Sequence, residues 1–431
     1  MPLRHIEYFI DFLHIVKYVE KICIRDRDAL AFFLVSYYRR VGQEPKSRIG
    51  VCVLSRRKMI VGAIVLVVCT FTVTAGGFLY LLNGSSTDVI SALKFFRAVQ
   101  IVKTRYVEPV PMETLMAGAV KGMVNSLGDP HSIYMDAKMY KEFMIETEGS
   151  FGGVGIVLGA KDKLLTVVSP IEGTPSEKAG IKSGDQIAKI DGQDTKDMAL
   201  DEAVSKIRGA EGSTVTLSIR RGSEPLKDYL LTRSSIQIKT VSGKMLPDQI
   251  GYIRISMFNE NTGSDFVKKY QELEKEGMKA IVLDLRDNPG GLLQESVKVS
   301  NLLVPKGPIV SVVTRDGQRE VHSSTLEAVK YPVAVLVNGG SASASEIVSG
   351  AIQDTGSGTL VGTKTYGKGS VQTVLRLDGG AMKLTIAKYL TPNDRAINGI
   401  GLEPDVKVEM AKDAVKDLQL DTAIQVVKGK M

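Results

Sequence analysis

Residues 333–353 read VAVLVNGGSASASEIVSGAIQ, and this stretch decides the fold. Its first five residues form an uninterrupted apolar run, which predicts a strand. Small residues follow and predict a close turn of the backbone. A helical run over 345–353 comes next. The stretch therefore predicts a strand, a turn and a helix, which is the repeating unit of an α/β domain.

The same alternation continues on both sides of this stretch. From about residue 248, β-branched runs alternate with helical segments, which favours a layered α/β domain that we place at 238–410. The predicted strands are 250–255, 280–284, 309–314, 333–337, 359–362 and 382–389. The predicted helices are 266–276, 293–303 and 345–353.

Residues 149–237 predict a smaller, β-rich domain with short helices at 176–179 and 200–207. The run SPIEGTPSEKAGIKSGDQIAKIDG at 169–192 resembles a bacterial PDZ domain, and FGGVG at 151–155 resembles the carboxylate-binding loop of that family. Glycines let successive N–H groups converge on one point, where a terminal carboxylate can bind, and the next strand can pair with the peptide. The predicted peptide-binding residues are Gly152, Gly153, Val154, Gly155 and Ile156.

The N-terminal part predicts a membrane segment followed by helices. Residues 59–82 carry no charge and would form a helix about 36 Å long, enough for a bilayer core of about 30 Å. Basic residues 56–58 precede it, so the positive-inside rule places the chain after residue 82 outside the cytoplasm. A cleaved signal peptide is the alternative. Residues 84–148 predict a helical region, and no function is assigned to residues 1–52.

Charge and cysteine content exclude several classes of function. Residues 1–58 hold twelve Lys and Arg against six Asp and Glu, so most of the net charge of +7 lies there and a nucleic-acid groove is not indicated. The three cysteines all lie at or before Cys69, which excludes a disulfide framework or a Cys-based metal site in the remainder. No metal or organic cofactor is predicted.

The catalytic candidates are a serine and a lysine. The four histidines are His5, His14, His131 and His322, and none lies near a Gly-x-Ser-x-Gly turn, so a Ser-His-Asp triad has little support. A lysine base is the other route to an active serine. The segment TYGKGSVQ at 365–372 offers one lysine flanked by glycines.

SASASE at 341–346 followed by GKGxxQ at 367–372 closely resembles the signature of the carboxy-terminal processing (tail-specific) serine proteases, over about residues 85–410. The segments 284–291 and 399–405 also match that pattern. The resemblance implies a crotonase-like α/β spiral core with an embedded PDZ domain, and a helical tail at 411–431. It implies Ser343 as nucleophile, Lys368 as general base and Gln372 as the residue that orients Lys368. The oxyanion hole would use the N–H of Ala344 with that of Gly290 or Gly291.

Three further expectations concern regulation and protonation. A lysine base must be neutral, and burial of Lys368 can lower its pKa to allow this. Relatives carry at Arg208 an arginine that links peptide binding to activity; a solvated charge is the alternative. Glu346 could contact the site, or could simply pair with the helix dipole.

The sequence thus predicts a membrane-anchored serine endopeptidase, single-pass, with its protease domain outside the cytoplasm. It would bind exposed C-termini of extracytoplasmic proteins through the PDZ domain and cleave through an acyl-enzyme. The predicted partners are such proteins or peptides and the membrane, with a homodimer as a further possibility; relatives include signalling proteases. A silent PDZ scaffold and an acyl-CoA enzyme are the two alternatives.

Overall fold

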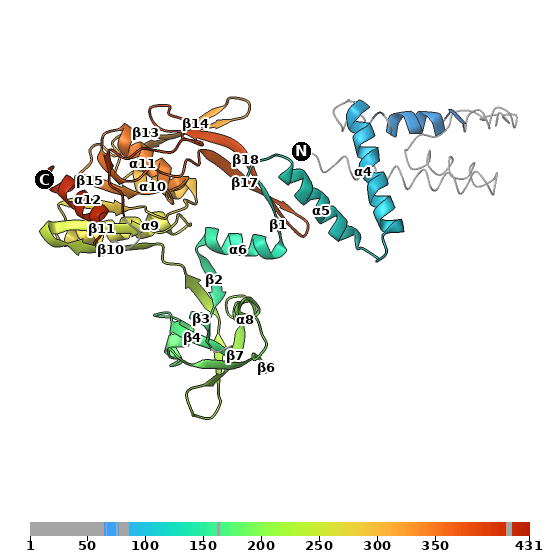
Figure 1. Cartoon of the computed structure of the whole chain (residues 1–431), viewed down its shortest axis with the longest axis horizontal. Helices are drawn as coiled ribbons and strands as arrows, with labels where there is room; N and C mark the ends of the chain where they lie inside the picture. Colours follow the sequence, from blue (N-terminus) through green and yellow to red (C-terminus); the bar gives the residue numbers. More distant parts are fainter. Residues whose placement is uncertain (1–63, 66, 75, 77–85, 162–163, 411–415) are drawn as a thin grey trace, which may run out of the picture. The chain divides into compact units, whose positions relative to one another are not determined.

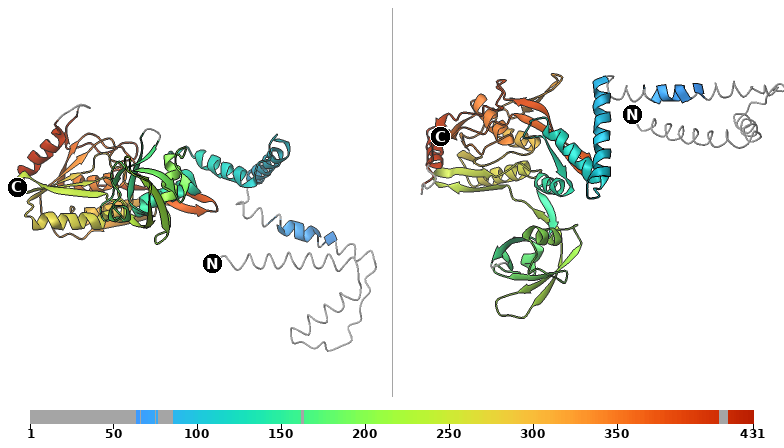
Figure 2. Two further views of the ribbon diagram at one scale, coloured as in Figure 1. Left: turned by 90° about the horizontal axis from the view of Figure 1, so that it is seen from below. Right: turned by 45° about the vertical axis from the view of Figure 1, so that its right-hand side comes forward.

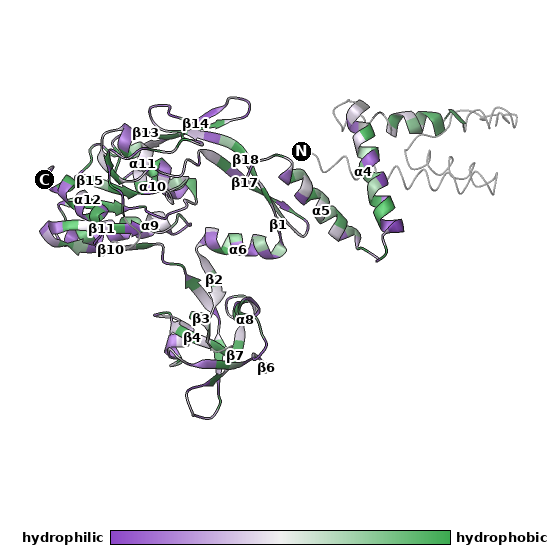
Figure 3. Cartoon of the chain, in the orientation of Figure 1, coloured by the Kyte–Doolittle hydropathy of each residue, from purple (hydrophilic) through white to green (hydrophobic). Residues whose placement is uncertain are grey.

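The computed structural model describes residues 64–65, 67–74, 76, 86–161, 164–410 and 416–431 (Figure 1). The chain divides into two units, residues 1–109 and 110–431. The first unit contains α4 (Ser86–Arg105), along which apolar and polar residues alternate (Figure 3). Helix α4 confirms a helix in this region.

The predicted transmembrane helix is not supported by the structure. Of residues 59–82, only 64–65, 67–74 and 76 lie within the described residues, and these are helical. Within the described ranges, no helix combines the length and the apolar character needed to cross a bilayer. The rest of the predicted span, and residues 1–52, lie outside the described residues.

A six-stranded sheet forms the centre of the second unit, in the order β10-β11-β12-β15-β16-β19, with all neighbours parallel except β10 and β11. Every residue of β12 and β15 is buried, because both faces of the sheet are covered. These strands are β10 (Val241–Leu246), β11 (Ile250–Ile255), β12 (Ala280–Asp284), β15 (Val333–Val337), β16 (Gly358–Gly362) and β19 (Val406–Lys407).

Alternate residues of these strands pack against different helices. One face, including Ile281 and Val335, packs with α9 (Thr262–Lys275), α10 (Leu293–Ser300) and α11 (Ala344–Asp354). The other face, including Val282, packs with α12 (Leu418–Lys428), the red helix in Figures 1 and 2. The predicted layered α/β domain is therefore confirmed.

A second, antiparallel sheet corrects part of the prediction. Segments 309–314 and 382–389 do form strands, but these lie outside the central parallel sheet. Three further strands of this sheet were not predicted. The sheet has the order β1-β18-β13-β14, with β17 also paired to β18, and its strands are β1 (Ile133–Asp136), β13 (Gly307–Thr314), β14 (Arg319–Ser324), β17 (Ser370–Leu377) and β18 (Gly380–Leu390).

The helices before the small domain, and the strands and short helices within it, agree in outline with the prediction. Helices α5 (Met112–Asn125) and α6 (Ala137–Glu148) precede the small domain, whose sheet has the order β3-β4-β5-β7-β8, with β6 on β5. The predicted helices appear as α7 (Pro175–Lys178) and α8 (Leu200–Ile207). The strands are β3 (Ile156–Lys161), β4 (Leu164–Pro170), β5 (Gln186–Ile190), β6 (Gln193–Asp194), β7 (Thr214–Arg220) and β8 (Lys227–Thr232), and β2 (Ser150–Gly153) pairs separately with β9 (Ser234–Gln237).

The C-terminal helix is fixed by a buried ionic network. Arg286 donates to both carboxylate oxygens of Asp284 and of Asp417, at 2.7–3.0 Å. Asp417 is also the N-cap of α12, where it accepts from the N–H of Leu420. Arg286 thus joins the end of β12 to the start of α12. This contact gives a structural role to Asp284 and Arg286, two of the polar residues in the segment 284–291.

Candidate active site

Three neighbouring parallel strands bring the predicted catalytic segments together. Strand β15 pairs with β12 on one side and β16 on the other, so their carboxyl ends meet at one edge of the sheet. The loop after β12 carries Gly290 and Gly291, the loop after β15 carries Ser343, and the loop after β16 carries Lys368. The topology therefore explains why residues 290, 343 and 368, far apart in sequence, lie at one site.

Ser343 occupies a strained turn at the start of α11. Its φ of 54° and ψ of −114° lie outside the regions that non-glycine residues usually adopt. Such backbone strain costs on the order of 1–3 kcal/mol and persists only where surrounding contacts fix it. Here the N–H of Ser343 donates to Glu346 Oε2 at 2.9 Å, and the hydroxyl of Tyr389 donates to the Ser343 carbonyl at 3.1 Å.

Asn288 fixes the glycine loop against this turn. Its carbonyl accepts from the N–H of Ala342 at 3.0 Å and from the hydroxyl of Ser345 at 2.9 Å. Its side-chain oxygen accepts from the N–H of Gly290 at 2.9 Å. A Cβ on Gly290 would lie 2.8 Å from the Cβ of Ser343, so only glycine fits there. Asn288 lies in the segment 284–291 that matches the family pattern, but the sequence predicts no role for it.

The two candidate glycines differ in hydrogen bonding. The N–H of Gly290 is already donated to Asn288. Within the described part of the chain, no hydrogen bond is formed by the N–H of Gly291 or by the N–H of Ala344. Ala344 is the first residue of α11, where N–H groups point outward from the helix and favour negative charge. This geometry favours Gly291 over Gly290 as the second donor.

Glu346 joins the serine turn to the lysine loop. It is fully buried and accepts four hydrogen bonds. Its Oε2 accepts from the N–H groups of Ser343 and Lys368, at 2.9 and 2.8 Å. Its Oε1 accepts from the Thr365 hydroxyl at 2.6 Å and from the N–H of Gly367 at 2.7 Å. Glu346 thus contacts the site directly, besides lying in the first turn of α11.

The side chain of Lys368 is desolvated and unpaired. Burial lowers the pKa of its amine, and the positive charge of Lys383 lowers it further, whereas Asp129 and Glu346 act in the opposite direction. Among the described residues, its Nζ has no hydrogen-bond or ion-pair partner. Its backbone is held at two points: its N–H donates to Glu346, and its carbonyl accepts from the Tyr389 hydroxyl at 2.6 Å. This environment agrees with the expected neutral amine.

Gln372 lies at the same site but does not contact Lys368 by a hydrogen bond. Its amide donates to the hydroxyls of Ser370 at 2.8 Å and Thr385 at 3.1 Å. The predicted orientation of Lys368 by Gln372 is therefore not formed in this structure. Tyr389, which sequence reasoning missed, is the residue that holds the Lys368 backbone; its inward position on β18 was the available signal.

A cleft of about 400 Å³ contains these groups. Ser343, Lys368 and Gln372 line it together with both glycines of the loop after β12. The described histidines, His131 and His322, are not among its lining residues, which agrees with the absence of a Ser-His-Asp arrangement here. Within the described ranges, no group of three or more His, Cys, Asp or Glu side chains could hold a metal ion.

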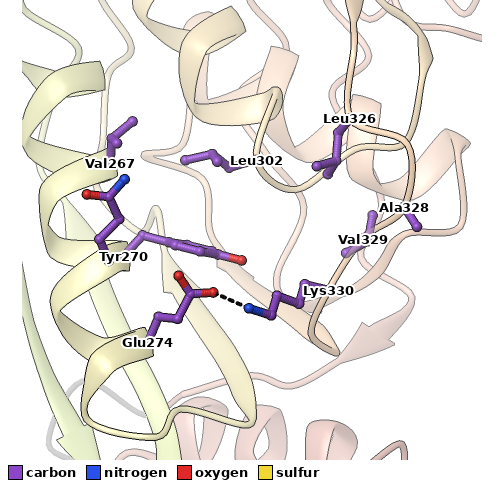
Figure 4. A pocket seen from close by; sticks show the side chains of 9 residues that line it. Val267, Tyr270, Glu274, Leu302, Leu326, Ala328, Val329 and Lys330 are labelled. Carbon is purple, nitrogen blue, oxygen red and sulfur yellow. Dashed lines mark hydrogen bonds and ion pairs between the residues drawn. The ribbon is translucent and has the colours of Figure 1, made fainter.

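A second pocket, of about 460 Å³, lies between α9 and the chain before β15 (Figure 4). Its charged groups are already paired, since Lys330 Nζ contacts Glu274 Oε1 at 2.6 Å and the Tyr331 hydroxyl donates to the same oxygen at 3.1 Å. The pocket thus lacks the unpaired reactive groups of the cleft around Ser343.

In the small domain, three of the five predicted peptide-binding residues lie at an open sheet edge: Ile156 begins β3, and Val154 and Gly155 directly precede it. Strand β3 is an edge strand that pairs only with β4 in its sheet. Within the described chain, the N–H groups of Val154 and Gly155 form no backbone hydrogen bond. Gly155 has φ +76° and a Cβ there would lie 2.3 Å from Thr174, so glycine is required. By contrast, Gly152 and Gly153 belong to β2, which pairs with β9.

Arg208 is half-buried and does not behave as a solvated charge. Its guanidinium lies 4.2 Å from the ring centre of Phe151, in β2. Burial lowers its pKa, and Glu142 of α6 opposes this shift. Arg208 therefore lies between the peptide loop and the helix that leads into the catalytic cleft.

Comparisons with known proteins agree with this site. The model of peptidase family S41 matches residues 249–408, a model described as the activating protease CtpB N-terminal domain matches 83–139, and the PDZ domain model matches 142–220. The carboxy-terminal-processing protease of Bartonella bacilliformis is 43% identical over 76% of this chain and 77% of its own length. The carboxy-terminal processing protease CtpA of Bacillus subtilis is 38% identical over 82% of this chain and 76% of its own length.

A solved photosystem II D1 C-terminal processing protease is 31% identical, covers 80% of this chain and 92% of that chain, and has a TM-score of 0.45. Given the extent of the sequence matches, the chain belongs to the carboxy-terminal processing proteases of peptidase family S41. It is thus a serine peptidase with a PDZ domain.

Proposed function

We propose that this peptidase cleaves with Ser343 as nucleophile and Lys368 as general base, after its PDZ domain has bound an exposed C-terminus. The observation that carries the proposal is the bridge through Glu346, which fixes the backbones of both residues at one cleft. An unpaired, desolvated lysine next to a strained serine is the arrangement that a serine–lysine mechanism requires.

In the first step, neutral Lys368 accepts the hydroxyl proton of Ser343 as its oxygen attacks the scissile carbonyl. The carbonyl oxygen becomes negative, and the N–H groups of Ala344 and Gly291 are the donors available to stabilise it. Lys368 then protonates the leaving amine, which frees one fragment and leaves an ester on Ser343. Water, deprotonated by the same lysine, hydrolyses the ester and restores the serine.

The resting structure is one step short of this arrangement. In the described part of the chain, no hydrogen bond joins the side chains of Ser343 and Lys368, and Gln372 is bonded to Ser370 and Thr385. Substrate binding would have to bring the two side chains into contact. Catalytic hydrogen bonds often form only when substrate is bound. The missing hydrogen bond between Ser343 and Lys368 therefore does not contradict the mechanism.

The PDZ domain supplies the selection of chain ends. The open edge of β3 can pair with an extended peptide, and the free N–H groups of Val154 and Gly155 can bind its terminal carboxylate. The contact of Arg208 with the ring of Phe151 supports the proposal that Arg208 responds to that binding. Membrane anchoring by residues 59–82, extracytoplasmic substrates, a signalling role and a homodimer stay predictions from the sequence and the resemblance.

The test compares wild type, Ser343→Ala and Lys368→Ala on an unstructured protein substrate. Lys364→Ala is the matched control, because Lys364 is an exposed lysine of the same loop whose partner is Glu403. Loss of a catalytic residue lowers kcat by about 10³-fold or more, whereas the control keeps wild-type activity. Equal cleavage by all four proteins would reject the dyad. Binding of the substrate without cleavage by wild type would favour the silent PDZ scaffold.

A further inference from the structure

The catalytic cleft contains a second lysine. Lys383 of β18 lines the same cleft as Ser343 and Lys368. Tyr389 of the same strand also lines this cleft, and its hydroxyl donates to the Lys368 carbonyl. The two lysine side chains thus enter one cleft, Lys368 from the loop before β17 and Lys383 from β18.

Lys383 has no anionic partner at contact distance. Within the described chain, its Nζ forms no hydrogen bond and no ion pair. Its ammonium instead lies 5.3 Å from the ring centre of Phe143 in α6. Lysines that are largely buried are usually paired, so an unpaired lysine at a cleft calls for a functional explanation. A cation–π contact favours the charged form of this side chain.

We propose that Lys383 is a positioning residue for the proposed reaction, whose ammonium disfavours a second positive charge in the cleft and so keeps Lys368 in the neutral form that accepts a proton. The inference rests on the proposed role of Lys368 as base. Two adjacent cationic groups are a known route to a neutral lysine, because like charges at short distance cannot both be ionised without cost.

The other charged groups around the pair act on the protonation of both lysines. Asp129 and Glu346 face Lys368 and favour its charge, but Glu346 is already surrounded by four donors. Burial and Lys383 outweigh them, so the pKa of Lys368 is lowered. Lys383 faces Glu146 of α6, which opposes the lowering of its own pKa by burial. Burial lowers the pKa of His131, in the turn before β1, and the positive charge of Lys383 acts in the same direction, whereas Asp129 opposes the shift.

The test reads the protonation of Lys368 without needing turnover. The full chain carries Ser343→Ala to prevent self-cleavage, and is labelled with acetic anhydride over a range of pH. Mass spectrometry gives the labelled fraction of Lys368, which follows its neutral form. The variants are Lys383→Gln, which removes the charge, and Lys383→Arg, which keeps it. Lys388→Gln is the control, because Lys388 is an exposed lysine of the same strand that does not line the cleft.

Lys383→Gln is expected to raise the midpoint for labelling of Lys368 by about one pH unit, since a unit charge in the same cleft has an effect of that order. Lys383→Arg and Lys388→Gln are expected to leave the midpoint in place. An unchanged or lower midpoint in Lys383→Gln overturns the inference, and so does an equal rise in Lys388→Gln.

Comparing the labelling of Lys368 with proteolysis separates this inference from the proposed function. Proteolysis that requires Ser343 and Lys368, with no effect of Lys383 on the labelling of Lys368, rejects the inference alone. A shifted midpoint, together with no cleavage by the protein that keeps Ser343, would reject the proposed function and leave the interaction between the two lysines established.

Discussion

Replacing Glu346 by glutamine tests the main structural argument, because one buried carboxylate holds both catalytic segments. Each carboxylate oxygen accepts two hydrogen bonds: Oε2 from the N–H groups of Ser343 and Lys368, and Oε1 from the Thr365 hydroxyl and the N–H of Gly367. Glutamine keeps one acceptor oxygen and places an NH₂ group where the other oxygen was. In either orientation of the amide, the new NH₂ group therefore faces two hydrogen-bond donors that an oxygen accepted from before.

The less costly orientation keeps the oxygen toward Ser343 and Lys368. The Thr365 hydroxyl can then accept from the new NH₂ group, but its own hydrogen must turn away from Glu346, and the N–H of Gly367 loses its acceptor. An unsatisfied buried donor costs about 1–3 kcal/mol, and replacing charged by neutral acceptors weakens the remaining bonds. We expect Glu346→Gln to lower the free energy of unfolding by about 3 kcal/mol and kcat by more than tenfold.

The matched control is Glu295→Gln. Glu295 is also buried in the protease core, where it accepts from the N–H of Gly263 at 2.8 Å, but it does not line the catalytic cleft. Urea denaturation measures stability, and kcat is measured well below each midpoint. Both variants should lose stability, but only Glu346→Gln should lose kcat. Full activity in Glu346→Gln, or an equal loss of kcat in Glu295→Gln, would refute the role of Glu346.

Two further predictions concern the base and the glycine loop. If Lys368 is the base, as proposed, its neutral form is the active one. In that case kcat/KM should rise as the pH rises through the pKa of Lys368, which burial lowers from the ordinary 10.5, and a rise centred at or above pH 10.5 contradicts this. Gly290→Ala should lower kcat by about 10²-fold, because φ is +99° and the new Cβ would lie 2.6 Å from a backbone carbonyl. Gly122→Ala, in α5 with nothing within 4 Å, should leave kcat unchanged, and loss of activity in both variants would point to a general defect.

The strand–turn–helix around Ser343 could be predicted from sequence because its signals are local. An apolar run, a small-residue turn and a helical period coincide over 333–353, and the structure has β15 and α11 there. The partition of strands into two sheets could not be predicted in this way. The segment 382–389 has the same β-branched character as the central strands, and only its long-range pairing with β1, β13 and β17 distinguishes it.

The candidate site shows the same limit. Ser343, Lys368 and Gln372 are predicted from the resemblance of two short motifs to a family signature, which reports residue type and order. Their contacts depend on loops that meet only in the folded sheet, so Asn288 and Tyr389 gave no separate signal. The choice between Gly290 and Gly291 likewise depends on a hydrogen bond to Asn288 that the sequence does not encode locally.

The hydrogen bonds around Ser343 and Lys368 indicate which parts of the site would have to move when substrate binds. The backbones of Ser343 and Lys368 are already held by Glu346 and by the Tyr389 hydroxyl. In the proposed mechanism, the groups that still lack their partners are the amine of Lys368 and the amide of Gln372, which donates to Thr385 of β18. The change that completes the site is therefore a rearrangement of side chains between the lysine loop and β18. It does not require the nucleophile turn itself to be rebuilt.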